Sequence, residues 1–581
     1  MNIFAAGLPS TTTAGGGQLP ASFALSDLGS PAVLKLLVVG HKLSCCGVGD
    51  NPGADGNANL QTAIVPKTGS LSGIVHHSRN LFLTGVFVPA PGNAAPRPPD
   101  LAYYAPADLA AGTSPPGGSL ADTALDMRPA LGQVFFIGDG RGIDAGGQLA
   151  QQRFHVPDGA TTLYLGFADG LNIGDPNHGT PSPAEPGSYA DNSGEVTVHV
   201  GSRYHGVGTG DVACAPGATP DLLDQASKQL TAQLGGTSTH VSFDWVTLEP
   251  RPPAGAGHAY SWGAADAQVE RALAQGLEPF AFTGNVPGWL LPPSYPAPSP
   301  PPPTGCDTAP PPPSAPPSCL GYRSFPDEAD HPDAEANLRA FATALAGRYC
   351  HRVHHYEFWN EENGCGSPDA ACSGSNYVEG YTRWLRVWYQ AMKAACPDTV
   401  LAIGGLACDS LDHPEYCKDY LEAIDHIAAR DQLGTIYDAV SVHPYGTLDL
   451  SRNQALNWSA LRLLDSVLAG TDKPVWLDEW GWNPRPSPPP APGSPAYDAA
   501  KAKGELDKAS AITTALAGLA ATRYDRVTEA RYLVMSDLPG AWWGLTDWDP
   551  ASSTLKPRPS WCALCRALHG GQACPACPAG P

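Results

Sequence analysis

The segment Tyr356-Glu357-Phe358-Trp359-Asn360-Glu361-Glu362-Asn363 is an apolar, strand-like run that stops at a carboxylate. A second segment, Val475-Trp476-Leu477-Asp478-Glu479-Trp480-Gly481-Trp482, stops in the same way. Two carboxylates delivered by strands that are far apart in sequence suit the cleavage of a sugar–oxygen bond, which needs one carboxyl group as acid and another as nucleophile or base. Glu361 and Glu479 are therefore the candidate catalytic pair.

From about residue 203, strand-like runs alternate with helical stretches on both sides of these two segments. Eight such alternations predict a (β/α)8 barrel with long insertions, in which the chemistry lies at the carboxyl ends of the strands. Glu361 and Glu479 fall at such ends, on strands four and seven. The expected strands are 205–211, 240–247, 278–285, 354–361, 400–404, 439–445, 475–479 and 531–536, and the expected helices are 220–234, 264–275, 332–349, 378–395, 415–430, 455–469 and 508–522.

The first third of the chain has a different texture. Short β runs broken by Gly, Pro and Asn predict an all-β sandwich over residues 22–201. We therefore expect a multidomain protein, with a disordered, Gly/Thr/Ser-rich segment 1–21, the sandwich, a barrel over 203–570 and a Cys/Pro/Gly tail over 571–581. The β runs are 32–39, 81–89, 132–137, 162–167 and 195–201.

The net charge and the hydropathy of the chain argue against a nucleic-acid partner and against a membrane span. The chain has 34 Lys and Arg against 56 Asp and Glu, a net charge of 34 − 56 = −22, and the acidity is spread along it. This favours solubility and argues against a nucleic-acid partner. Apolar runs stay well below the about 20 residues that a membrane span needs. The first 17 residues lack the pattern of a secretory signal peptide.

Fifteen cysteines are many for a cytosolic enzyme. Three close pairs lie in loops rich in Gly, Pro and Ser, which predicts local disulfides and hence a secreted or secretory-pathway protein; reduced, buried thiols are the alternative. Two CxxC motifs near the end of the chain could form a four-thiolate zinc site, but the short spacer favours disulfides or a disordered tail. The pairs are Cys306/Cys319, Cys365/Cys372 and Cys408/Cys417, and the motifs are Cys562/Cys565 and Cys574/Cys577.

A proline-rich insertion over residues 287–326 follows the third expected strand. Runs of three to four prolines form semi-rigid polyproline II and do not pack as a core. The insertion should project from the active face, either as a lid or wall or as a tolerated surface feature.

The two carboxylate segments resemble motifs of a known clan. Trp359-Asn360-Glu361, with Asn363, resembles the Trp-Asn-Glu-Pro-Asn signature of retaining (β/α)8 glycosidases, and Asp478–Gly481 resembles their Thr-Glu-Phe/Trp-Gly nucleophile segment. The resemblance covers residues 203–570 and is nearest in style to glycoside hydrolase family 39 and its neighbours. Supporting segments are Trp245-Val-Thr-Leu-Glu249-Pro250, Pro287-Gly288-Trp289, His443-Pro444-Tyr445 and Trp542-Trp543-Gly544-Leu545.

By position, the resemblance implies that Glu361 is the acid/base and Glu479 the nucleophile of a retaining reaction. Phe358 and Trp359 are expected to form an apolar wall that raises the pKa of the acid, and Glu357 is interpreted as structural. No catalytic cofactor is implied. The substrate contacts implied are Asn360 at the sugar 2-hydroxyl, Tyr445 or His443 near Glu479, Trp543 as the platform of the reacting sugar, and Trp245 and Trp289. Asp244 is an alternative polar contact, since the clan's strand-two Arg is missing here.

Two departures from the clan pattern leave alternatives open. Glu362 stands where the clan has Pro, and the stretch His240–Asp244 lacks the Arg that many relatives carry on strand two. The alternatives are an inactive carbohydrate-binding wall or matrix protein and a transglycosylase. In each of them the partner is still a poly- or oligosaccharide.

The first domain resembles the β-sandwich of bacterial calcium-dependent galactophilic lectins and related carbohydrate-binding modules. The resemblance implies a Ca²⁺ site with Asp169, Ser188, Asp191 and Asn192 as oxygen ligands. The alternative interpretation is that Asp-Asn-Ser-Gly is only a tight turn between strands. The segments that carry the resemblance are Val134–Gly140, Phe154–Pro157, Ala160–Asp169 and Pro186–Gly194.

Overall fold

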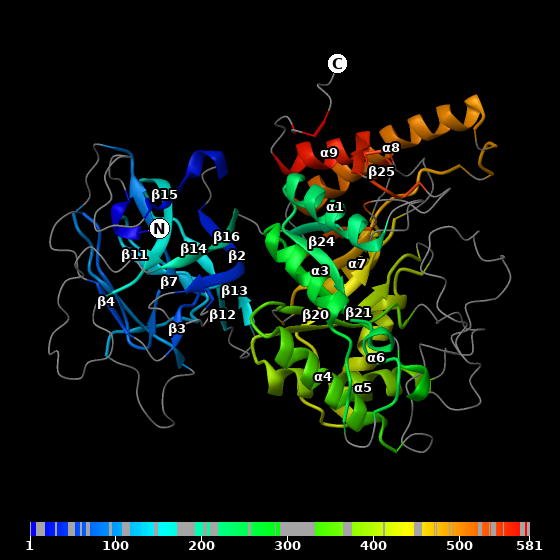
Figure 1. Ribbon diagram of the computed structural model, residues 1–581, viewed down its shortest axis with the longest axis horizontal. Helices are drawn as coiled ribbons and strands as arrows, with labels where there is room; N and C mark the ends of the chain where they lie inside the picture. The colour runs from blue at the N-terminus through cyan, green and yellow to red at the C-terminus, as the bar shows by residue number, and fades with distance from the viewer. Residues whose placement is uncertain are drawn as a thin grey trace. The chain divides into compact units, whose positions relative to one another are not determined.

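The structure is a computed structural model of the 581-residue chain. The chain divides into two compact units, Met1–Tyr204 and His205–Pro581 (Figure 1). The structure describes residues 2–569 with gaps, together with positions 574, 576 and 577; the gaps of eight or more residues are 7–17, 45–52, 107–116, 171–191, 210–218, 291–331, 364–374 and 447–455.

The first unit consists mainly of β-strands. Its two main sheets have four strands each, in the orders β1-β15-β7-β11 and β10-β14-β2-β16. The pairs are antiparallel except β10 with β14. Each of the five β runs expected from the sequence falls on one of these strands. The strands are Ala21–Ala24 (β1), Val33–Ser44 (β2), Phe82–Pro89 (β7), Asp126–Met127 (β10), Val134–Phe136 (β11), Arg153–His155 (β14), Ala160–Ala168 (β15) and Ser193–Gly201 (β16).

One apolar core lies between residues of both main sheets. The ring of Phe135 on β11 lies 5.4 Å from that of Phe154 on β14 and 5.4 Å from that of Phe87 on β7. Leu34 and Leu36, two residues apart on β2, are fully buried, as the alternation of side chains along a strand requires. The smaller strands are Asn57–Ala58 (β3), Thr62–Ile64 (β4), Ile74–His76 (β5), Arg79–Asn80 (β6), Leu101–Tyr104 (β8), Leu120–Ala121 (β9), Arg141–Ile143 (β12) and Leu149–Gln151 (β13), with one 3-10 turn at Leu25–Leu28 (η2).

Part of the amino-terminal segment is ordered, contrary to the prediction. A 3-10 turn, Ile3–Ala5 (η1), follows Asn2, whose Oδ1 accepts a hydrogen bond from the N–H of Phe4 at 2.9 Å. The side chain of Ile3 is fully buried in the core of the first unit. The expectation of disorder is therefore wrong for residues 2–6, because the buried Ile3 and the N–H of Asn2, which donates to the carbonyl of Gln18, anchor them, and composition does not reveal such contacts. Residues 7–17 lie outside the described part.

The second unit contains a closed barrel of eight parallel strands in sequence order, and β17 and β24 complete the circle. The barrel strands are Gly206–Thr209 (β17), Ser238–Ser242 (β18), Glu278–Thr283 (β19), His355–Asn360 (β20), Val400–Ala407 (β21), Ala439–His443 (β22), Val475–Trp480 (β23) and Val527–Tyr532 (β24). Helices lie around these strands (Figure 1). They are Pro220–Gln233 (α1), Trp245–Leu248 (α2), Gly263–Ala274 (α3), Ala334–Tyr349 (α4), Ser375–Ala395 (α5), Tyr416–Arg430 (α6), Trp458–Val467 (α7), Pro495–Ala520 (α8) and Pro559–Leu568 (α9), with a 3-10 turn Gly288–Leu290 (η4) and a hairpin of Thr546–Asp549 (β25) and Thr554–Pro557 (β26).

Alternate residues of each barrel strand face inward. On β20, His355 stacks on Phe280 of β19 with ring centroids 4.2 Å apart, and Trp476 of β23 meets His355 edge-on at 5.2 Å. Phe358 instead stacks at 4.9 Å on Trp388 of α5. The barrel is therefore filled by side chains, and its strands are buried on both faces, which explains their nearly continuous apolar runs.

Two barrel strands differ from their expected bounds by four residues or more at one end or both. The second ends at Ser242, and Trp245–Leu248 forms the short helix α2 because Trp245 Nε1 donates to Glu249 Oε2 four residues on, at 2.9 Å. The eighth is Val527–Tyr532, earlier than the expected 531–536, and helix α8 begins at Pro495 rather than near residue 508.

Four disulfides lie in the described part of the second unit. The predicted pair Cys408–Cys417 is confirmed. The two CxxC motifs pair crosswise with each other, so all four thiols are committed to disulfides rather than to zinc. One bridge, Cys350–Cys396, joins the ends of α4 and α5 and was not foreseen. Cys306, Cys319, Cys365 and Cys372, and most of the proline-rich insertion, lie outside the described residues. The crosswise bridges are Cys562–Cys577 and Cys565–Cys574.

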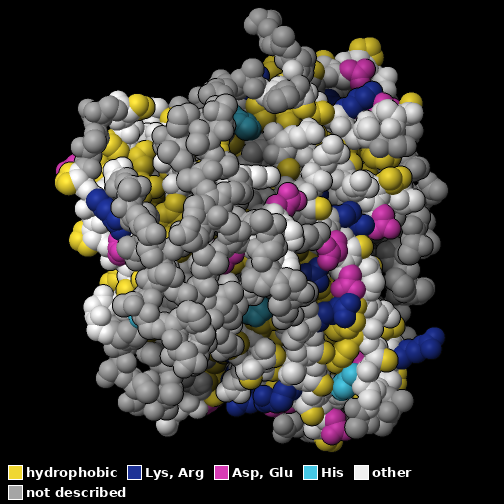
Figure 2. All heavy atoms as spheres, turned by 60° about the vertical axis from the view of Figure 1, so that its left-hand side comes forward, with side chains coloured by type: hydrophobic (Ala, Val, Ile, Leu, Met, Phe, Trp, Pro, Cys, Tyr) yellow, Lys and Arg dark blue, Asp and Glu magenta, His cyan; other side chains and the backbone are white. Residues whose placement is uncertain are grey.

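Among the described helices, none is long and apolar enough to cross a bilayer. On the face shown in Figure 2, the described acidic and basic side chains are interspersed. Pairs such as Arg348–Asp266 and Arg430–Glu379 have both members partly exposed. The described part of this face therefore does not present a continuous basic surface of the kind that binds nucleic acid.

Candidate active site

Glu361 is held just beyond the carboxyl end of β20 by an unusual backbone. Trp359 and Glu361 have φ angles of 79° and 50°, in the left-handed region that non-glycine residues seldom occupy. The N–H of Glu361 donates to the carbonyl of Gly405 at 2.9 Å, and the side-chain amide of Asn363 pairs with both backbone groups of Ala407. Such conformations persist where neighbouring contacts impose them, and they gather at functional sites.

Glu479 lies near the carboxyl end of β23, and its side chain approaches that of Glu361. A carboxylate oxygen of each residue and a ring nitrogen of His443 all lie within 4.8 Å of one another. Tyr445 donates its hydroxyl to Glu479 Oε2 at 2.9 Å. The Glu361 and Glu479 side chains are 32% and 22% exposed. The two carboxylates are thus close together and both reach solvent.

His443, the last residue of β22, lies between the two carboxylates. Its Nδ1 is 2.9 Å from Glu361 Oε1 and 3.5 Å from Glu479 Oε2, and its ring is fully buried. Burial alone lowers the pKa of His443, but the charge of Glu479 and hydrogen bonds to Asp478 and Glu361 raise it well above its usual value. His443 is therefore an imidazolium near neutral pH. Gly405 leaves it room, since a Cβ there would overlap the ring at Nε2.

Asp478 and Arg531 form a buried ion pair beneath His443. Both side chains are 1% exposed, and the guanidinium of Arg531 donates to Asp478 Oδ1 and lies 3.9 Å over the ring of Phe280. His240 Nε2 is 2.8 Å from the same oxygen, and His443 Nε2 is 3.5 Å from Oδ2. Burial raises the pKa of Asp478, but the charges of Arg531 and His240 and the histidine hydrogen bonds hold it well below its ordinary range.

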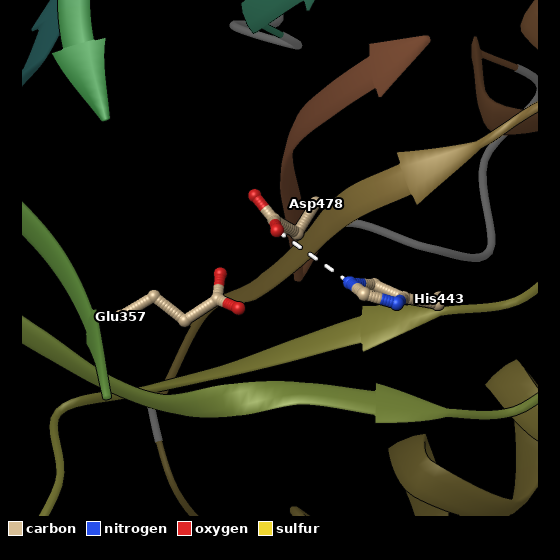
Figure 3. Close-up of side chains that lie close together, drawn as sticks. All are labelled: Glu357, His443 and Asp478. Atoms are coloured by element: carbon tan, nitrogen blue, oxygen red, sulfur yellow. Dashed lines mark ion pairs between the residues drawn. The ribbon is translucent and has the colours of Figure 1, made fainter. Parts of the chain in front are cut away.

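Glu357 completes this buried layer. Its carboxyl oxygens accept from the N–H of Gly405 at 2.7 Å and from Ser441 Oγ at 2.8 Å. Burial, and then the charge of Asp478, raises its pKa well above the ordinary value, which favours the protonated form. Figure 3 shows Glu357, His443 and Asp478 directed toward one another from three strands. Glu357 thus packs as a neutral group inside the barrel, below the exposed carboxylates.

Two sets of side chains here could in principle bind a metal: Glu357 with His443 and Asp478, and Glu361 with His443 and Glu479. Both depend on His443. An imidazolium has no lone pair for a metal, and the surrounding carboxylates stabilise that protonated form.

The burial of Glu479 affects its protonation. Burial raises the pKa of Glu479 and the charge of Asp478 adds to this, while the charges of His443 and His240 and the Tyr445 hydroxyl oppose it. The net shift is upward. Glu479 therefore ionises at a higher pH than an ordinary glutamate, and Tyr445 is one of the groups that oppose the shift.

The aromatic residues named from the sequence fall into two groups. Trp543 is half-buried, and its ring meets that of Tyr445 edge-on at 5.3 Å, beside the carboxylate pair. Trp245 is only 2% exposed and stacks on Phe341 at 4.9 Å, so in this structure it packs in the core and offers no surface to a substrate. Trp289 is half-buried and donates to the carbonyl of Glu249 at 3.0 Å.

The structure also describes two polar residues that were expected to contact the substrate, Asp244 and Asn360. Asp244 is the residue before α2 and accepts from Thr247 Oγ1 at 3.2 Å. Asn360 is half-buried at the end of β20, next to Glu361. The expectation that Phe358 forms a wall beside Glu361 is wrong, because alternation along β20 turns its ring outward to Trp388.

Sequence reasoning missed Arg531. It looked for an arginine on the second strand, whereas the guanidinium next to Asp478 comes from the eighth. The usable signal was an arginine directly before the apolar run Tyr532–Met535, where a charge must find a buried partner. Glu362, at the position where the clan pattern has Pro, is 1% exposed. Burial, and then the charge of Glu362, raises the pKa of Tyr381 well above its ordinary value.

The expected calcium ligands of the first unit are only partly described. Asp169 is 3% exposed, and its two oxygens accept from the side-chain amides of Asn192 at 2.9 Å and Asn80 at 3.4 Å. Ser188 and Asp191 lie outside the described residues. Both amides donate to Asp169 here; rotation of the Asn192 amide by 180° would present an oxygen, the ligand type that calcium takes.

No protein-family model and no curated protein matches the sequence. Among solved structures, a family 39 glycoside hydrolase from the gut symbiont Bacteroides cellulosilyticus WH2 is similar at 14% identity and a TM-score of 0.41, over 91% of this chain and 82% of that one. Xylanase B from Clostridium stercorarium F9 is similar at 14% identity and a TM-score of 0.40, over 62% and 96%. The β-glycosidase from the hyperthermophile Thermosphaera aggregans is similar at 12% identity and a TM-score of 0.42, over 63% and 96%. Similarity at these scores does not identify a reaction.

Replacing Asp478 tests the buried ion pair. Asp478→Asn should lower the free energy of unfolding at pH 7 by about 3–5 kcal/mol, because the buried Arg531 loses its charged partner. The pKa of Asp478 is depressed in the folded state, so its contribution is present above the ordinary carboxyl pKa and is lost as the pH falls through the folded-state pKa. Urea unfolding at several pH values measures the difference from wild type, which should shrink only in strong acid.

The matched control is Glu379→Gln, which breaks the exposed pair with Arg430 at 2.9 Å. It should change the free energy of unfolding by about 0–1 kcal/mol. A loss in Asp478→Asn no larger than that of this control would contradict the role given to the buried pair.

Proposed function

We propose that the second unit is a retaining glycoside hydrolase that cleaves β-linked bonds of a poly- or oligosaccharide, with Glu361 as acid/base and Glu479 as nucleophile. The observation that carries the proposal is that oxygens of the two carboxylates approach within 4.8 Å at the carboxyl ends of strands four and seven. Retaining enzymes space their carboxyl groups by about 5–5.5 Å, whereas inverting enzymes need about 6.5–9.5 Å to admit a water.

In the first step, protonated Glu361 gives its proton to the glycosidic oxygen as the bond from that oxygen to the anomeric carbon breaks. The Glu479 carboxylate attacks the anomeric carbon, and a covalent glycosyl ester forms. In the second step, the Glu361 carboxylate takes a proton from a water molecule. The resulting hydroxide oxygen bonds to the anomeric carbon, Glu479 leaves as a carboxylate, and Glu361 is protonated again.

His443 and Tyr445 suit this cycle. The imidazolium lies 2.9 Å from Glu361 and 3.5 Å from Glu479, so it offsets the repulsion of two nearby carboxylates whenever both are ionised. The Tyr445 hydroxyl holds one oxygen of Glu479, which aims the other at the reacting carbon. Trp543, edge-on to Tyr445, is the platform for the sugar.

The first unit is proposed to be a β-sandwich that binds carbohydrate. The supporting observation is that two four-stranded sheets share one apolar core. We further propose a calcium ion held by Asp169 and Asn192, with Ser188 and Asp191, which when bound would offer coordination positions to sugar hydroxyls. The disulfides support a secreted or secretory-pathway location, because such bonds persist in oxidising compartments.

Substitution of the carboxylates tests the reaction. Glu361→Gln should lower kcat/KM on aryl β-glycosides by about 10²–10⁴-fold, because the leaving oxygen loses its acid. Azide should restore turnover of Glu361→Ala on substrates with good leaving groups and give a glycosyl azide, and Glu479→Gln should lose turnover without such rescue. Initial rates and NMR of the product anomer measure these outcomes.

The control Glu422→Gln, which alters an exposed carboxylate paired with Lys418, should keep wild-type activity. Wild-type turnover in Glu479→Gln, or an inverted product, would contradict the assignment. Binding to glycans with no turnover of any glycoside would favour the non-enzymatic alternative, and transfer to an added acceptor sugar would favour a transglycosylase.

The pH profile tests the nucleophile separately. The pKa of Glu479 is raised, and kcat/KM requires the ionised form, so activity should fall as the pH drops through a value above 4.5. Tyr445→Phe removes a hydrogen bond that lowers this pKa, so the acidic limb should move to higher pH. Tyr389→Phe, which removes a hydroxyl bound to Asp438 at 2.8 Å, is the control and should leave the limb in place. An unmoved limb in Tyr445→Phe would contradict the assignment.

A chelator tests the calcium site. Removal of calcium should lower the melting temperature of the full chain by about 5 °C or more relative to a solution with calcium at about 100 times Kd, because the ion binds the folded state only. Asp169→Asn should abolish this difference, whereas Asp158→Asn, at an exposed position of the same unit, should retain it. Equal melting temperatures of the wild type with and without chelator, by calorimetry, would count against the site.

A further inference from the structure

Lys508 is a lysine with no solvent exposure in the interior of the second unit. It lies on α8, and its ammonium donates to three successive backbone carbonyls: to Trp542 at 3.0 Å, Trp543 at 3.4 Å and Gly544 at 2.6 Å. Its charge is matched by Glu505, one turn earlier on α8, at 2.7 Å. A buried ammonium is costly unless it is paired and hydrogen-bonded, and here both conditions are met.

A second cation meets the same segment. Arg558, 6% exposed, donates to the carbonyl of Gly544 at 2.8 Å and lies 3.7 Å from Glu505. Ser560 donates to the other oxygen of Glu505 at 2.8 Å. The Glu505 carboxylate therefore has partners on both oxygens, and two cations converge on one carbonyl.

The segment held by this network carries two tryptophan side chains in different environments. With the carbonyls of residues 542–544 turned toward Lys508, Trp542 is buried and donates to Tyr497 of α8 at 3.2 Å. Trp543 instead is half-buried and meets Tyr445, whose hydroxyl holds Glu479. The buried Tyr532 also donates to the carbonyl of Trp543 at 3.2 Å.

We infer that the Glu505–Lys508 ion pair is a positioning device for the substrate platform: it orients the backbone of residues 542–544 so that Trp543 stands against Tyr445 beside Glu479. An apolar side chain at position 508 would fill the space but remove one donor from each of three inward carbonyls, while Arg558 and Tyr532 would still donate to those of Gly544 and Trp543. The segment would then turn, and Trp543 with it. The expected change in kcat/KM rests on the proposed glycosidase function, whereas the expected change in the position of Trp543 does not.

The test removes both charges together, so that neither partner is left buried alone. In Glu505→Gln/Lys508→Met, kcat/KM on an aryl glycoside that the wild type cleaves should fall by about tenfold or more, since small displacements of contact groups are costly. In a Trp543→Ala background the same double change should lower kcat/KM by less than about twofold, because the side chain that the ion pair orients is already absent. The melting temperature should fall equally in both backgrounds.

The control is Lys503→Met/Asp507→Asn, an ion pair on the same helix whose lysine is 70% exposed. It should leave kcat/KM unchanged in both backgrounds. An equal loss from Glu505→Gln/Lys508→Met with and without Trp543 would overturn the inference, because the pair would then act on general stability alone.

A second readout does not need activity. In protein labelled with 5-fluorotryptophan, the resonance that Trp543→Phe removes is that of Trp543, and it should shift in Glu505→Gln/Lys508→Met but not in the control. Should the neutral pair not fold, Lys508→Arg keeps the charge but presents a planar fork in place of a compact ammonium, and it should shift the same resonance. An unmoved Trp543 resonance overturns the inference, whereas a wild type without turnover but with the expected shift overturns only the glycosidase proposal.

Discussion

The buried pair of Asp478 and Arg531 is the interaction on which the upper end of the barrel depends. Arg531 neutralises Asp478, and Asp478 in turn stabilises the positive charge of His443. That imidazolium then lies against Glu361 and Glu479. Like charges at this distance push one of two carboxylates to take a proton, and the nearby imidazolium offsets their repulsion when both are ionised.

The alternation of side chains between the two faces of a strand explains how β20 serves two purposes. On β20, the inward residues His355 and Glu357 fill the barrel, while the outward Phe358 packs on the helices. Glu361 lies neither inside the barrel nor against the helices, because its positive φ departs from strand geometry. Glu357 is neutral and buried, and Glu361 is a third exposed, so two glutamates four residues apart have different chemistry.

Some of the site could be predicted from the sequence. The eight alternations and the strand ends identify Glu361 and Glu479, and the resemblance to the clan adds His443 and Tyr445; the structure brings these four together. Two predictions failed because they ignored the direction of side chains: Phe358 faces outward and Trp245 is packed in the core. Arg531 was missed because its partner lies 53 residues earlier, and no local pattern links the two.

By itself, the sequence determined the alternation of strands and helices, the two carboxylates at strand ends and the cysteine pair Cys408–Cys417, because each is a local pattern of hydropathy or spacing. Only the tertiary structure decided the charge state of each group. Burial and long-range partners set the pKa values of Glu357, Asp478 and His443. The contacts of Lys508 with residues 542–544 arise only when α8 packs against the segment that follows the eighth strand. Electrostatic free energy depends on distance and solvent access, and neither is written in the order of residues.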